Sequence, residues 1–158
     1  AMDRRVQAAV EGAGRDQLLR RLAEAMAGLE PALVESDSRR LVAEILRRTR
    51  RRSLVVLFTG LEAPGLEQGL LPVLTSLTSR HTVVLAAVGD PRIAQMRAAR
   101  GTADAVYEAA AAEQSQHERS RMTALLRGRG VEVVDAPPAD FAPAVADAYL
   151  SLKAAGRL

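Results

Sequence analysis

Two short segments of the chain carry hydroxyl and carboxylate side chains of the types that bind hard cations. Thr59 and Glu62 follow a run of apolar residues, and Ser36 and Asp37 lie in a polar segment further upstream. Such oxygen ligands suit Mg²⁺. Each segment also has a purely structural interpretation, because Ser36 or Asp37 can cap a helix and Glu62 can lie in solvent. The residues by themselves leave both interpretations open.

The histidines and the absence of cysteine limit the catalytic and metal-binding chemistry that the chain can support. His81 and His117 are the only histidines, and the sequence contains neither an H-x-x-x-H pair nor a G-x-S-x-G nucleophile motif. We expect both histidines to lie at the surface or at its boundary. Because the chain has no cysteine, it has no disulfide, no thiolate metal site and no cysteine nucleophile.

Neither nucleotides nor nucleic acids are favoured as ligands. Gly12-Ala13-Gly14 lacks the third glycine of G-x-G-x-x-G, since position 17 is Gln, and no Gly-Lys-Ser/Thr occurs, so we predict an ordinary turn. The arginines of segment 47–52 lie at the C-terminal end of a predicted helix, where cations complement the helix dipole. They have no interleaved aromatic residues that could stack on bases. We therefore predict no nucleic-acid partner, and an arginine-based nucleic-acid binder is the weakest alternative.

The composition is that of one ordinary globular domain. Its 158 residues are 48% apolar and 26% charged, with a net charge of +3. No apolar run approaches the ~18 residues of a membrane span. No apolar segment typical of a signal peptide follows the first charged residues. We therefore expect one domain over 1–158, located in the cytoplasm and making no membrane contact of its own.

The order of the predicted elements indicates a mainly parallel α/β sheet. Apolar runs predict about four strands, and apolar spacing of three and four residues predicts helices between them. This alternation is typical of a doubly wound fold with right-handed crossovers, in which ligands bind beyond the carboxyl ends of the strands. The expected strands lie near 4–10, 53–59, 81–88 and 131–134. The expected helices cover 15–29, 41–50, 66–77, 91–99, 102–127 and 139–155.

Several segments, in this order, are similar to a known family. Segment 51–59, Arg-Arg-Ser-Leu-Val-Val-Leu-Phe-Thr, closely resembles the "R-R-S-L-V-V-L-x-T-D-L" strand of that family. The start at 3–6, the polar loop Glu35-Ser36-Asp37, Asp90-Pro91, segment 130–135 and the ending at 149–153 also fit. Over essentially its whole length the chain resembles the C-terminal half of the von Willebrand factor A-like domain of the bacterial domain-of-unknown-function family fifty-eight.

The resemblance implies a function in assembly. Members of that family carry two membrane helices before this domain, and their genes often neighbour MoxR-type AAA+ ATPases. The resemblance therefore implies a non-catalytic protein-interaction module that acts with such an ATPase. The full-length relative would be membrane-anchored, with this domain on the cytoplasmic side. The chain itself would be a fragment or a truncated form of the A-like domain.

The resemblance also implies a degenerate metal site. The metal-ion-dependent adhesion site of A-type domains uses Asp-x-Ser-x-Ser on the first strand, a hydroxyl from a middle loop and an Asp after the fourth strand. The Asp-x-Ser-x-Ser segment would precede residue 1. Gly60 stands where the Asp after the fourth strand is expected. Ser36 or Asp37 and Thr59 are left, with Glu62 as a substitute carboxylate. We predict no cofactor and no tightly bound metal, with weak Mg²⁺ binding at most.

The loss of the first, central strand of an A-type domain has a structural consequence. Either the strand expected at 4–10 pairs with that at 53–59, or another chain fills the gap and a homodimer forms. The partner-binding or residual metal rim is expected at Ser36, Asp37, Thr59 and Glu62. The alternative function is a small metal-assisted α/β hydrolase that uses the same loops.

Overall fold

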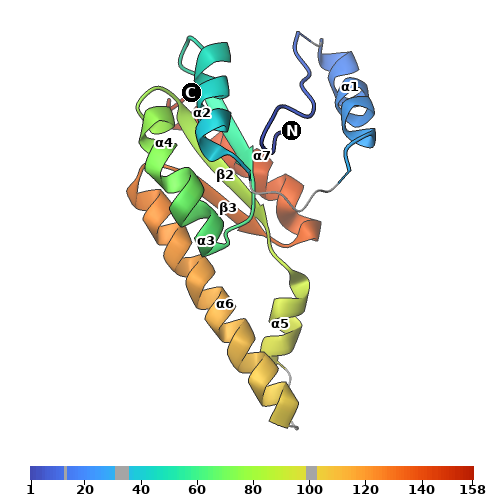
Figure 1. Ribbon diagram of the computed structural model, residues 1–158, viewed down its shortest axis with the longest axis vertical. Helices are drawn as coiled ribbons and strands as arrows, with labels where there is room; N and C mark the ends of the chain where they lie inside the picture. The colour runs from blue at the N-terminus through green and yellow to red at the C-terminus, as the bar shows by residue number, and fades with distance from the viewer. Residues whose placement is uncertain (13, 31–35, 99–102) are drawn as a thin grey trace.

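The protein forms an open sheet of three parallel strands, seen in the computed structural model of Figure 1, which describes residues 1–12, 14–30, 36–98 and 103–158. The strands are β1 (Leu54–Phe58), β2 (Thr82–Val88) and β3 (Glu132–Ala136), in the spatial order β1-β2-β3. Val56 lies opposite Val84, and Ala86 lies opposite Val134. These strands confirm the predictions at 53–59, 81–88 and 131–134 to within two residues at each end.

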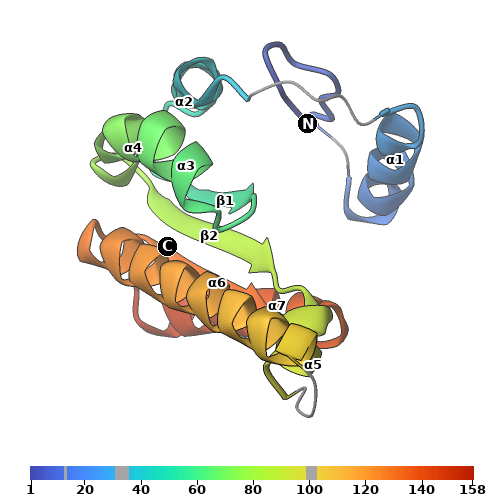
Figure 2. The ribbon, with the colours of Figure 1, turned by 60° about the horizontal axis from the view of Figure 1, so that its bottom comes forward.

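Helices cover both faces of the sheet, as in doubly wound α/β folds. Figure 2 shows α4 and α6 on one face and α7 on the other. The predicted mixed α/β architecture is therefore confirmed. The helices are α1 (Arg15–Ala27), α2 (Ser38–Arg48), α3 (Ala63–Gly65), the π-helical turn η1 (Leu66–Leu70), α4 (Leu71–Thr78), α5 (Pro91–Ala98), α6 (Ala103–Gly128) and α7 (Pro138–Ala154).

The larger core lies between the sheet and the helices α4 and α6. Leu74 and Leu77 of α4 and Met122 and Leu126 of α6 pack there against Leu85 of β2, and all five are essentially buried. A smaller core on the opposite face joins β2 and β3 to α7. β2 is buried on both faces along nearly its whole length, as its continuous apolar run predicts.

β1 is buried on one face only, whereas its nearly continuous apolar run predicts a strand buried on both faces. Val55 and Leu57 are buried, whereas Leu54 and Val56 are half-buried and Phe58 is 68% exposed. The reason is position: β1 is an edge strand, and α7 packs mainly on β3 and β2. An apolar run alone does not distinguish an edge strand from a central one.

The strand predicted at 4–10 is not formed, so the sheet has three strands rather than about four. This segment contributes only one isolated bridge, between Met2 and Val6. The Asp3 carboxylate accepts hydrogen bonds from the Arg5 amide at 2.9 Å and from Gln7 Nε2 at 2.7 Å. This local turn competes with an extended strand, and the apolar alternation of the segment is too weak to favour one.

The helix expected at 66–77 is divided into η1 and α4, and the short α3 precedes it. Pro72 lies in the first turn of α4, directly after the π-helical turn. Proline has no backbone N–H, so a continuous helix through this position would lose an internal hydrogen bond. Each of the other predicted helices is formed with shifts of at most three residues at either end. Among the described helices, none has the length and hydropathy needed to cross a bilayer.

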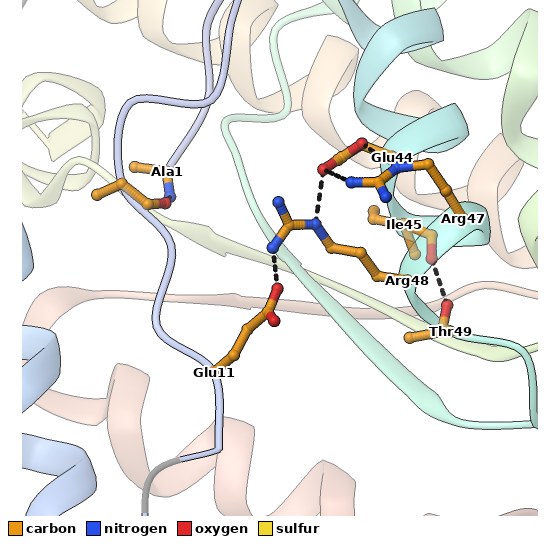
Figure 3. A network of polar contacts seen from close by, with 8 residues as sticks. Ala1, Glu11, Glu44, Ile45, Arg47, Arg48 and Thr49 are labelled. Atoms are coloured by element: carbon orange, nitrogen blue, oxygen red, sulfur yellow. Dashed lines mark hydrogen bonds and ion pairs between the residues drawn. The ribbon is translucent and has the colours of Figure 1, made fainter.

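The N-terminal segment is attached to α2 through polar contacts. In Figure 3, Arg48 contacts the carboxylates of both Glu11 and Glu44, and Arg47 also binds Glu44. The Asp37 amide donates to the Asp3 carbonyl at 3.1 Å. The helix α1 stands apart from the sheet in both views of the whole chain. Its apolar side chains are exposed, including Leu19 at 81% and Met26 at 60%.

Candidate functional site

The predicted residues Thr59 and Glu62 lie beyond the carboxyl end of β1. The Thr59 amide donates to the Ala86 carbonyl at 3.2 Å, which keeps the start of the loop beside β2. Glu62 is the residue before α3, and its side chain is 74% exposed. Its carboxylate turns back over Gly60 and occupies the space that a Cβ at position 60 would need. The carboxylate of Glu62 thus lies where a side chain at position 60 would begin.

A buried arginine connects this loop to the end of β3. The Arg119 side chain, from the middle of α6, is only 11% exposed. Its Nη2 donates to Asp135 Oδ1 at 2.6 Å and its Nε donates to Asp135 Oδ2 at 3.3 Å. Its Nη1 lies 3.9 Å from Glu62 Oε1. One guanidinium therefore compensates two carboxylates at the carboxyl edge of the sheet.

The loop after β2 completes this edge. The Gly89 amide donates to the Ala136 carbonyl at 2.8 Å, so the loop lies against the end of β3. Asp90 Oδ1 accepts from the Arg92 amide at 2.9 Å and caps α5. The same carboxylate pairs with the Arg92 guanidinium at 2.9 Å. The Asp90 carboxylate is therefore already bound by Arg92 within its own turn.

Ser36 and Asp37 are not joined to the other two predicted residues. Asp37 Oδ1 accepts from the Arg40 amide at 2.9 Å and caps α2, so its structural interpretation is confirmed. Within the described part of the chain, no hydrogen bond or ion pair links Ser36 or Asp37 to Thr59 or Glu62. Glu35, from the same predicted loop, lies outside the described residues.

The residues do not fit the metal site that the resemblance implies. In the described ranges, no three Asp, Glu, His or Cys side chains are grouped as a metal ion requires. The Asp135 carboxylate is bound by Arg119, and Asp37 is used as a cap. A guanidinium also places positive charge near Glu62, where a cation would have to bind.

The position of His81 differs from the prediction. His81 is 4% exposed, so it is a core residue, whereas His117 is exposed as expected. His81 Nε2 lies 3.4 Å from Thr49 Oγ1, and Nδ1 is buried without a hydrogen-bond partner. The apolar run that follows His81 forms the buried strand β2, so the imidazole at its start is buried as well. Neither histidine belongs to the carboxyl edge.

The arginine segment is divided between two environments. Arg47 and Arg48 lie in the last turn of α2 and pair with Glu44, as the dipole interpretation predicts. Arg50, Arg51 and Arg52 follow the helix and are exposed. These three form no ion pair with any residue that the structure describes.

Arg119 and Asp135 are the site residues that sequence reasoning missed. Asp135 could have been found, because it lies near the carboxyl end of a predicted strand. Nothing in the sequence distinguishes Arg119 from the other arginines of a long helix. The chain matches no protein-family model, no curated protein and no solved structure. The resemblance to the A-like domain therefore stays a prediction.

Proposed function

We propose that this chain is a non-catalytic protein-binding module and that its contact surface is the rim formed by Phe58, Thr59 and Glu62. The resemblance of its segments to the A-like domain supports a MoxR-type AAA+ ATPase as the partner. It also supports an assembly role on the cytoplasmic side of a membrane.

The observation that carries this proposal is the exposure of two side chains that follow one another closely in sequence at the carboxyl end of β1, one aromatic and one charged. Phe58 is 68% exposed and the Glu62 side chain is 74% exposed. Phe58 also contacts the Phe141 ring edge-to-face at 6.0 Å, which restrains its orientation. Exposed aromatic side chains are enriched at the centres of protein interfaces, and charged side chains lie at their polar rims.

The rim has no catalytic pair that would favour an enzyme. Within the described residues, the Thr59 hydroxyl has no hydrogen-bond partner that could act as its base. Arg119 and Asp135 satisfy one another. A nucleophile needs a base within hydrogen-bond reach and a third group that orients the base. The arrangement therefore supports binding more than turnover.

The test is a binding titration against a MoxR-type AAA+ ATPase, the partner that the resemblance implies. Glu62→Arg is expected to weaken binding about tenfold or more, because it reverses the exposed charge of the rim. Glu24→Arg is the matched control, since the Glu24 side chain is 61% exposed on the distant α1. Equal affinities of the wild type and Glu62→Arg, or no binding by the wild type, would overturn the proposal.

A further inference from the structure

The outer edge of β1 presents backbone groups that nothing in the described chain uses. The Ser53 carbonyl accepts from the Thr82 amide at 3.1 Å, and the Thr59 amide donates to the Ala86 carbonyl at 3.2 Å. Ser53 and Thr59 thus direct their backbone groups toward β2. Because this direction alternates along a strand, Leu54, Val56 and Phe58 direct theirs away from the sheet. No described residue hydrogen-bonds to them.

The side chains of these three residues form an apolar strip beside the free edge. Leu54 and Val56 are partly buried against the smaller core below α7, and Phe58 contacts Phe141 of α7. The strip is only half covered, because α7 packs mainly on β3 and β2. An apolar edge strand that is neither charged nor covered is a template for pairing with another strand.

We propose that a second copy of this chain pairs with β1 in antiparallel orientation and continues the sheet across a twofold axis. In the register with the most pairs, Val56 faces Val56 of the second copy and Leu54 faces its Phe58. Both members of each facing pair direct their backbone groups toward one another, so each pair exchanges two hydrogen bonds. A shift by one residue would set outward groups against inward ones.

The charges that flank β1 favour the antiparallel orientation. Arg50, Arg51 and Arg52 precede the strand and have no ion pair within the described chain, whereas the exposed Glu62 follows it. In the proposed register, the arginines of one copy reach the end of the strand where Glu62 of the other copy lies. Parallel pairing would instead bring the two arginine clusters together.

The helix α1 supplies further apolar surface on the same side of the molecule. Figure 1 and Figure 2 both show α1 beyond β1, on the side of its free edge. Its Leu19 and Met26 are exposed. The helix thus adds exposed apolar surface to that of the free edge of β1.

The first experiment measures the oligomeric state by sedimentation across a range of concentrations. The wild type is expected to dimerise, and Phe58→Lys is expected to weaken dimerisation about tenfold or more, because it places a charge in a facing pair. Val56→Pro removes one outward N–H and should have the same effect, whereas Val56→Thr should retain the dimer. A monomeric wild type would overturn the proposal. A dimer that survives Phe58→Lys in folded protein would do so as well.

A second experiment tests the register by oxidative cross-linking. The chain has no cysteine, so one introduced cysteine is unique. Facing residues of a hydrogen-bonded antiparallel pair have Cα atoms ~5.5 Å apart, which suits a disulfide. Val56→Cys should therefore cross-link with itself. Leu54→Cys should cross-link only when mixed with Phe58→Cys. Absence of the Val56→Cys dimer under oxidation would overturn this register. Because the dimer covers Phe58 and Glu62, dimerisation and ATPase binding are alternative uses of the same edge, and neither experiment depends on the ATPase.

Discussion

The guanidinium of Arg119 holds the carboxylate of Asp135 through two hydrogen bonds, at 2.6 Å from Nη2 and 3.3 Å from Nε. Arg119 belongs to α6 and Asp135 to β3, so this pair fastens the long helix to the carboxyl edge of the sheet. The third nitrogen of the guanidinium faces Glu62 at 3.9 Å. The Glu62 side chain therefore lies against an ion pair between α6 and β3, two elements that are far from it in sequence.

Replacement of Arg119 by Gln is expected to lower the free energy of unfolding by about 2 kcal/mol, since it removes two charge-assisted hydrogen bonds from a side chain that is only 11% exposed. Urea denaturation measures this loss. Arg121→Gln is the matched control, because the Arg121 side chain is 61% exposed and pairs with Glu67 at 3.1 Å. We expect it to cost less than about 1 kcal/mol. Equal losses in the two variants would contradict a structural role for the Arg119 pair.

A titration of the wild type with Mg²⁺ or Mn²⁺ is expected to give no saturable heat up to about 1 mM. The carboxylates of Glu62 and Asp135 face the guanidinium of Arg119. The ligands predicted before α2, Ser36 and Asp37, have no hydrogen bond or ion pair to Glu62 within the described chain. Calorimetry makes this measurement, with Glu62→Ala as the comparison. Binding in the micromolar range that Glu62→Ala abolishes would show that the degenerate site still holds a metal ion.

The sequence predicts the layers of this fold better than the environment of each strand. The runs that become β1 and β2 are almost equally apolar, yet only β2 is buried on both faces. Whether a strand is central or at an edge depends on which neighbours pair with it. Segment 4–10 shows the same limit, because local hydrogen bonds to Asp3 replace a strand that has no partner.

The site residues show which part of a site can be predicted from local sequence. Thr59 and Asp37 lie where strand ends and helix starts place them, and both elements follow from local patterns. The orientation of Glu62 depends on Gly60, which leaves space for the carboxylate, and on Arg119, which attracts it. Arg119 lies more than fifty residues away in a different element. Its role depends on tertiary packing, which spacing alone does not predict.

Replacement of His81 by Leu is expected to raise the free energy of unfolding by about 1 kcal/mol. The Nδ1 atom of His81 is buried without a partner, and an unsatisfied polar atom in a core is costly. His81→Gln is the control, since it keeps polar atoms at the same place and should bring no gain. Chemical denaturation of the three proteins tests this. A clear loss of stability in His81→Leu would mean that the imidazole is hydrogen-bonded in solution.

The contacts of Glu44 within α2 make the stability of this helix sensitive to acid. Hydrogen bonds from Arg47 and then Arg48 lower the pKa of Glu44 from 4.5 to about 2. A carboxyl group whose pKa is lowered in the folded state stabilises the fold above its unfolded-state pKa. That contribution is lost as the pH falls through the folded-state value. Compared with Glu44→Gln, the wild type should therefore keep a small advantage in melting temperature above pH 4.5. The advantage should shrink between pH 4.5 and about 2. Melting curves of both proteins across this range test the expectation, and a difference that does not change with pH would contradict it.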